Sequence, residues 1–157
     1  MEECQAIEDK ESLRVKLLSH RAFLPIRASQ GSAGFDVRAT KDYTIGPNEQ
    51  IKIPLELSIF PPKGCYTQVA SRSSMVMKNV FTQGGIIDSD YTGDLIVILC
   101  NKQDRQYSIK RGDKIAQLIL HRIATPTIST VNSLPQTQRS FRSFGSSDSQ
   151  INPISVA

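Results

Sequence analysis

The chain has 157 residues, of which 39% are hydrophobic and 22% are charged, so it is most simply one globular domain with its own core. Its formal net charge of +4 fits a phosphate-bearing ligand but does not by itself indicate a nucleic-acid or membrane partner. The cysteines Cys4, Cys65 and Cys100 are odd in number and far apart, which disfavours a disulfide framework and a Cys-x-x-Cys zinc site.

The two ends of the chain differ in composition from its middle. Residues 1–12 carry five acids and one lysine, which predicts a disordered tail and excludes a signal peptide. No apolar run approaches the ~20 residues that a membrane span needs. We therefore expect a reduced, soluble, intracellular protein of the cytoplasm or nucleus. Residues 132–157 hold seven serines and few groups that could pack, so we expect a flexible carboxy-terminal arm.

The first predicted strands lie at 13–18 and, after a Gly/Ser-rich loop, at 35–39. Apolar and polar residues then alternate from 51 to 59, a pattern of one half-buried strand or a broken pair of strands. Pro54 predicts a sheet edge or a bulge within it. Four later segments also have strand composition: 65–70, 95–100, 115–120 and 127–131.

Among these, residues 95–100 are continuously apolar, which is typical of a central strand covered on both faces. Turn-forming sequences occupy 60–64 and 110–114, and only 73–80 could form a helix, with Ser73 as its N-cap. The fold class is therefore all-β, a jelly-roll-like barrel or sandwich of short strands with at most one short helix, spanning residues 13–131.

Acidic residues cluster immediately before the apolar run that begins at Leu95. The sequence DYTG at 90–93 is typical of a type I turn, which alone favours a solvated hairpin. Asp88, however, lies before that turn and follows Ile86, Ile87 and the glycine pair at 84–85. Two glycines permit a close approach to the backbone, so Asp88 is a candidate for chemistry at the mouth of a pocket.

Three further segments carry candidate site residues. Arg72, Ser73 and Ser74 combine a guanidinium with two hydroxyls and fit a phosphate cradle, although a polar loop is the simpler interpretation of so short a motif. Asp36 is expected to accept backbone hydrogen bonds where a strand begins. Gln117 lies inside an apolar strand, where a buried amide needs partners.

Five motifs appear in a fixed order: AGFD, SRSS, GGIIDSDYTG, RGDKIAQL and R-x4-FGSS. In this order they resemble the motifs of the trimeric dUTPases, and the resemblance covers residues 13–148. It implies Mg²⁺-dependent hydrolysis of dUTP to dUMP and pyrophosphate by a homotrimer with shared sites. It also implies that Asp88 is the general base, that Tyr91 packs on the deoxyribose, and that the backbone around Gly85 and Ile87 reads the uracil.

The same resemblance assigns the remaining site residues. Arg72, Ser73 and Ser74 would hold phosphates, Gln117 would support them or the attacking water, and Asp36 would order the water shell of the metal or the framework of the site. The Mg²⁺ would be held by phosphates and water with no direct protein ligand. The carboxy-terminal motif would grip the γ-phosphate through Arg139, stack Phe144 on the uracil, and add Gly145 and Ser146 to the substrate contacts.

Two motifs depart from the family pattern. Ser74 stands where the family usually has glycine, and in the fifth motif Ser140, Arg142 and Ser143 replace glycines while Asp148 stands at the last glycine position. A dUTPase-derived protein that acts through partner binding is therefore the alternative. A dCTP deaminase relative ranks lower, because the strand at 95–100 lacks the glutamate of that branch.

Overall fold

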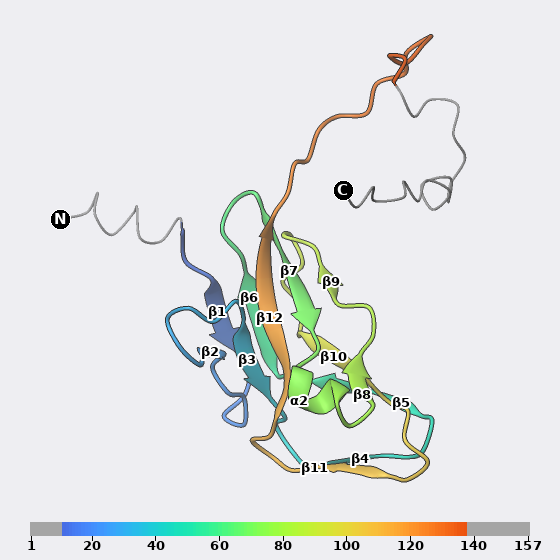
Figure 1. The fold of residues 1–157 in the computed structure, drawn as a ribbon. Coiled ribbons are helices and arrows are strands. Elements are labelled where there is room, and N and C mark those ends of the chain that lie inside the picture. Colours follow the sequence, from blue (N-terminus) through green and yellow to red (C-terminus); the bar gives the residue numbers. More distant parts are fainter. Residues whose placement is uncertain (1–10, 138–157) are drawn as a thin grey trace, which may run out of the picture. The chain divides into compact units, whose positions relative to one another are not determined.

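The computed structural model describes residues 11–137 and shows a chain built almost entirely of β-strands (Figure 1). The chain divides into two compact units, Met1–Thr125 and Pro126–Ala157, and every described strand lies in the first. The strands are β1 (Arg14–Leu17), β2 (Ile26–Arg27), β3 (Phe35–Arg38), β4 (Tyr43–Ile45), β5 (Gln50–Pro54), β6 (Leu57–Phe60), β7 (Cys65–Ala70), β8 (Val80–Thr82), β9 (Ile86–Ile87), β10 (Ile96–Asn101), β11 (Tyr107–Ile109) and β12 (Lys114–Arg122); the helix is α2 (Ser73–Val76).

These strands form four antiparallel sheets. The largest has the order β2-β3-β12-β7-β9, a second has the order β5-β10-β8, and β1-β6 and β4-β11 form two-stranded ribbons. The five-stranded sheet lies over β5, β6 and β10 as one layer of a sandwich (Figure 1). The predicted all-β sandwich is thus confirmed, and no sheet among the described residues closes into a barrel.

The core lies between these layers and consists of aliphatic side chains from both of them. Its largest fully buried members are Ile45, Ile53, Leu55, Leu57, Leu95, Leu99, Ile109, Ile115 and Leu118. Each such side chain contributes roughly 1.5–3 kcal/mol when it leaves water. The core therefore fixes the five-stranded sheet, whose strands carry Asp36, Ile87 and Gln117.

The alternating segment at 51–59 forms a broken pair of strands. β5 ends at Pro54 and β6 begins at Leu57, and between them Glu56 has a positive φ of 56°. β5 pairs only with β10 and is therefore an edge strand, as Pro54 predicts. The apolar run becomes the central strand β10, but it is not covered throughout, because Ile96 is 39% exposed.

Three sequence predictions are corrected by the structure. The helix covers only 73–76, and Val80 belongs to β8. Arg72, not Ser73, is the N-cap, and no side chain caps the helix. Residues 127–131 form no strand; they lie in the second unit, where the exposed Ile128 and Val131 have no sheet to join.

No helix within residues 11–137 is long and apolar enough to cross a membrane. Cys65 and Cys100 are both free thiols. The expected turns are present: the N–H of Cys65 donates to the carbonyl of Pro62, and that of Asp113 donates to the carbonyl of Lys110.

Candidate functional site

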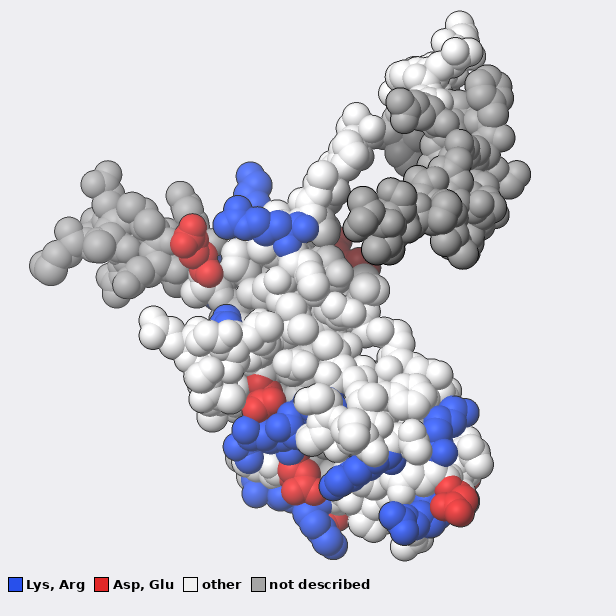
Figure 2. Space-filling view, viewed as in Figure 1, with Lys and Arg blue, Asp and Glu red and all other residues white. Residues whose placement is uncertain are grey.

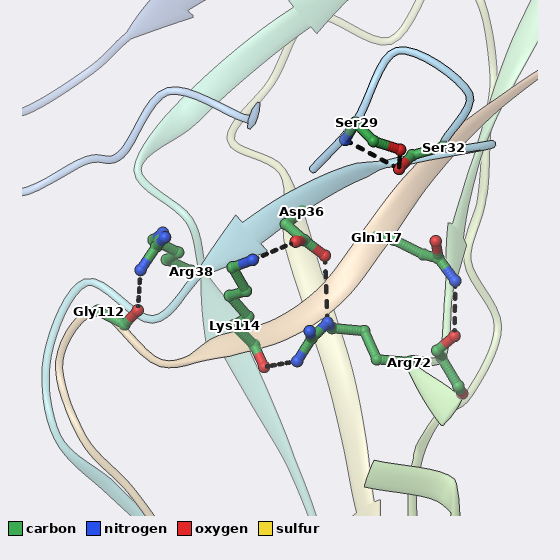
Figure 3. Close-up of polar contacts among 9 residues, drawn as sticks. Ser29, Ser32, Asp36, Arg38, Arg72, Gly112, Lys114 and Gln117 are labelled. Atoms are coloured by element: carbon green, nitrogen blue, oxygen red, sulfur yellow. Dashed lines mark hydrogen bonds and ion pairs between the residues drawn. The ribbon is translucent and has the colours of Figure 1, made fainter. Parts of the chain in front are cut away.

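A cluster of three charged side chains forms where β3, β12 and the segment after β7 meet (Figure 3). Asp36 accepts a hydrogen bond from Arg72 Nε at 3.1 Å through Oδ1 and pairs with Lys114 Nζ at 2.7 Å through Oδ2. Arg72 Nη1 also donates to the backbone carbonyl of Lys114 at 3.2 Å. One carboxylate therefore lies between two cations, and the cluster keeps a net positive charge.

Asp36 differs from its sequence-based prediction. Its carboxylate binds two side chains and not backbone N–H groups, because the antiparallel pairing of β3 with β12 brings Lys114 close to it. Burial raises the pKa of Asp36, but the hydrogen bond from Lys114 and the charges of Arg72 and Lys114 outweigh burial and lower that pKa below 3.8. Asp36 is therefore held as an anion.

Gln117 lies directly across from Asp36 on β12 and across from Ala70 on β7. Its amide Nε2 donates to the carbonyl of Ser71 at 3.0 Å, so it has the partner that its position requires. A side chain at Gly34 would collide with the Gln117 amide and the backbone of Leu118, which explains the glycine of the first motif.

Ser73 and Ser74 follow Arg72 and have exposed side chains. Ser74 and Arg72 border a hollow of about 380 Å³ whose other charged lining residues are Arg38, Lys78, Asp113 and Lys114. The hydroxyl of Ser71, just before them, contacts the Thr82 hydroxyl of β8 at 2.9 Å and accepts a hydrogen bond from the Thr82 backbone N–H at 2.8 Å. The polar segment after β7 is thus anchored to a neighbouring strand.

The second group of site residues lies on the loop around β9. β9 pairs with β7, and the carbonyl of Gly85 accepts a hydrogen bond from Val69 N at 2.7 Å. Gly85 has a φ of +98°, and a Cβ there would collide with the carbonyl oxygen of Val69. The close approach that the glycine pair predicts is therefore made by the chain's own strand β7.

The turn in this loop falls two residues earlier than the sequence predicts. Tyr91 N donates to the carbonyl of Asp88 at 3.1 Å, so the turn is DSDY at 88–91 and not DYTG. The Tyr91 hydroxyl donates to the carbonyl of Asp94 at 3.0 Å, and a side chain at Gly93 would collide with that hydroxyl. This contact holds the Tyr91 ring against the residues that follow the turn.

Asp88 borders a small hollow of about 190 Å³ whose other walls are apolar or aromatic: Ile86, Ile87, Tyr91 and Ile96. Ile86 and Tyr91 are 62% and 45% exposed, so the hollow is open to solvent. A carboxylate at the rim of such a hollow can accept a proton from water beside a ligand held against the apolar wall.

The predicted site residues thus form two groups. Asp36, Arg72 and Gln117 come together with Lys114, and Ile87, Asp88 and Tyr91 come together at the second hollow. No hydrogen bond or ion pair described within residues 11–137 joins the groups. Asp36 lies on β3 and Asp88 follows β9, three strand spacings or roughly 14 Å apart across the sheet.

Arg139, Phe144, Gly145 and Ser146 lie outside the described residues. Within residues 11–137, no three His, Cys, Asp or Glu side chains gather closely enough to hold a metal ion. Lys114 was missed in the sequence, although RGDK places a cation just before a strand. Only the register of β12 against β3 shows that this cation reaches Asp36.

The strands form an all-β sandwich, and the site residues comprise a basic cluster and a separate carboxylate on the loop after β9. Residues 20–148 match the family model for dUTPase. The chain is 41% identical over 140 residues to the deoxyuridine 5′-triphosphate nucleotidohydrolase of Mus musculus, which covers 88% of this chain and 86% of the mouse protein.

Solved structures agree with this match. The dUTPase of Staphylococcus bacteriophage 80alpha, a mutant with dUpNHpp, superposes with a TM-score of 0.80 and 28% identity over 87% of this chain and 98% of its own. A mutant dUTPase of phage phi11 of S. aureus, described with a structural Mg(II) ion, has a TM-score of 0.74 and 26% identity over 80% and 99%. The chain belongs to the dUTPase family.

Proposed function

We propose that this chain hydrolyses dUTP to dUMP and pyrophosphate. The observation that carries the proposal is the pairing of family membership with an exposed carboxylate, Asp88, on the rim of an apolar hollow. Asp88 accepts a proton from water, whose oxygen attacks the α-phosphorus. The bond from that phosphorus to the bridging oxygen of the leaving pyrophosphate breaks, and the proton later passes from Asp88 to solvent.

The nucleoside binds at the hollow beside Asp88. Tyr91 lies against the deoxyribose, and its anchor on the Asp94 carbonyl keeps the ring in place. The backbone at Gly85 and Ile87 reads the edge of the uracil. Such recognition discriminates by hydrogen bonds and by shape, without a charged side chain.

The phosphates bind at the basic cluster, where Arg72, Ser73 and Ser74 hold them and Gln117 supports them. Arg72 Nε and Nη1 are occupied, while Nη2 has no hydrogen-bond partner among the described contacts of residues 11–137. The guanidinium is therefore fixed in position with donors left for an oxyanion. This is the supporting geometry for the phosphate role.

The residues present fit a hydrated Mg²⁺ that the nucleotide itself holds. A carboxylate has about four lone-pair sites, so Asp36 can still accept a hydrogen bond from a metal-bound water after binding its two cations. When bound, Mg²⁺ neutralises phosphate charge and polarises the phosphorus–oxygen bonds. The structural Mg(II) of the phage phi11 relative concerns that protein and supports the choice of metal.

The active unit that we propose is a homotrimer with shared sites, in which the Asp88 loop of one chain faces the basic cluster of a second and the carboxy-terminal arm comes from a third. Two observations support it: the two groups of site residues do not touch within a chain, and Ile26 and Ile86 are 56% and 62% exposed beside the outer face of the five-stranded sheet. A monomer at micromolar concentration in light scattering would contradict this arrangement.

The activity is tested by incubating the pure protein with dUTP, dCTP or dTTP and Mg²⁺ and identifying the products. We expect dUMP and pyrophosphate from dUTP alone. Asp88→Asn keeps the shape of the side chain and loses the base, so turnover should fall ~10²–10⁴-fold while dUpNHpp still binds. Deamination of dCTP, or binding of nucleotides without any hydrolysis, would overturn the proposal in favour of one of the alternatives.

A further inference from the structure

Basic side chains gather over the end of the molecule that carries α2, β4 and β11, with acidic ones between them (Figure 2). Two hollows lie in this region. One, of about 380 Å³, borders Arg72 and Ser74; the other, of about 880 Å³, lies between the turn after α2 and the turn from β10 to β11. Lys78 and Tyr107 line both hollows, so the two adjoin and their linings form one run of residues along the surface.

The charge of this continuous surface is strongly one-sided. Its lining contains six cations, Arg38, Arg72, Lys78, Lys102, Arg105 and Lys114, and two acids, Asp104 and Asp113. Counting Asp36, which binds Arg72 and Lys114, leaves a net charge of six minus three, or +3. The hollow at Asp88, by contrast, carries only that one carboxylate.

The outer part of this surface is held rigidly by a buried asparagine. Asn101 is 0% exposed; its Nδ2 donates to the carbonyls of Ile45, Gly46 and Arg105, and its Oδ1 accepts from Gln103 N at 3.0 Å. The N–H of Lys102 also donates to the carbonyl of Asn79 at 2.8 Å, which joins this turn to the residue after Lys78. Lys102 and Arg105 are thus presented on a fixed turn and not on a loose loop.

No ion pair among those described in residues 11–137 involves Lys78, Lys102 or Arg105. The only hydrogen bond described there for the side chains of these three cations runs from Arg105 Nε to the amide oxygen of Gln103, at 3.2 Å. Their positive field is therefore directed into solvent. Because Debye screening acts over about 8–10 Å in physiological salt, a row of such charges leading to the basic cluster attracts a polyanion before contact.

We propose that this continuous basic surface, from Arg105 and Lys102 through Lys78 to Arg72, steers the triphosphate of the nucleotide into its site. The inference rests on the proposed function, since it takes the basic cluster at Arg72 as the phosphate site. Lys102 and Arg105 act before binding and do not touch the bound nucleotide, so they raise the association rate and leave the dissociation rate unchanged.

The test compares two matched double variants of the full chain. Lys102→Gln with Arg105→Gln removes two cations from the basic surface. Lys63→Gln with Arg122→Gln removes two cations at the opposite end of β7 and β12 from α2, where Arg122 pairs with Cys65. Association and dissociation rates of dUpNHpp are measured by stopped flow, in competition with a fluorescent nucleotide, across a range of salt concentrations.

We expect the first variant to bind about 3- to 10-fold more slowly than the wild type at ~20 mM salt and within about twofold of it at ~0.5 M, with unchanged dissociation. The control should differ by less than about twofold throughout. Equal association rates for the two variants, or a change confined to dissociation, would overturn the steering role. A wild type that fails to bind dUpNHpp at all would instead refute the proposed function. If the double variant does not fold, the single substitutions K102Q and R105Q, both at exposed residues, provide the same test with a smaller expected decrease in the association rate.

Discussion

Replacing Asp36 by asparagine removes the charge that holds Arg72 and Lys114 together while keeping the size of the side chain. Hydrogen bonds to charged groups are worth ~1.5–3 kcal/mol when shielded, and exposed ion pairs ~0–1 kcal/mol. The side chain of Asp36 is 13% exposed and those of its partners are 27% and 35% exposed, so this cluster lies between the two cases. We expect Asp36→Asn to lower the free energy of unfolding by about 1–2 kcal/mol at pH 7.

The pH dependence of this difference has a definite sign. The pKa of Asp36 is lowered in the folded protein, so its contribution is fully present above the unfolded-state value of 3.8 and is lost as the pH falls through the lower folded-state pKa. The gap in stability between wild type and variant should be constant from pH 7 to about pH 5 and should close below 3.8.

Urea denaturation at several pH values measures this gap, with the protein concentration held fixed because assembly would shift the midpoint. Asp42→Asn is the matched control: its pair with Lys110 joins side chains that are 60% and 74% exposed, so it should change stability less. The reasoning would be refuted by a stability gap that is absent at pH 7. It would also be refuted by a gap that persists unchanged at pH values where Asp36 is protonated in both the folded and the unfolded state.

Three further predictions concern the supports of the site. Gly85→Ala should lower the free energy of unfolding by about 2–3 kcal/mol and impair hydrolysis, because the new side chain strains a positive φ and collides with Val69. The control Gly64→Ala, at a φ of +78° with open space around it, should lower the free energy of unfolding less in the same urea titration. Asn101→Ala should lower the free energy of unfolding by about 2–3 kcal/mol, because it leaves four backbone groups, one buried and three part-buried, without their partner, and differential scanning calorimetry checks this. A chain truncated after Pro135 should melt near the full-length temperature, since the described residues of the second unit form no strand or helix. The same truncated chain should hydrolyse dUTP more slowly by orders of magnitude. Retained turnover would show that Arg139 and Phe144 are not part of the site.

Strands with an alternating pattern or a continuous run of apolar residues could be predicted from the sequence, because such patterns indicate which side chains are buried. β5, β6, β7, β10 and β12 all fall where the pattern places them. The short strands β4, β8 and β11 were missed, since three residues are too few to show a period. Their pairing depends on partners far away in the chain, such as Tyr107 opposite Ile45.

Lys114 shows a second limit of sequence patterns. Its sequence context indicates a turn followed by a strand, and both are present. Its contact with Asp36 accompanies a bulge-like shift in the register of β12 against β3 between Lys114 and Ala116. A bulge is a property of two strands together, so neither strand's sequence contains it.

The motif GGIIDSDYTG, which carries Asp88 and Tyr91, lies on a part of the fold that its local sequence predicts poorly. Asp88 and Tyr91 follow β9, a strand of only two residues that comes after two glycines, which disfavour strands. Local preference therefore cannot hold this loop in place. A tertiary contact and a side-chain contact within the loop do so: Gly85 packs on Val69 of β7, and the Tyr91 hydroxyl donates to the carbonyl of Asp94. Because each contact depends on the absence of a side chain at Gly85 or Gly93, the glycines of this motif help to place the loop that carries Asp88.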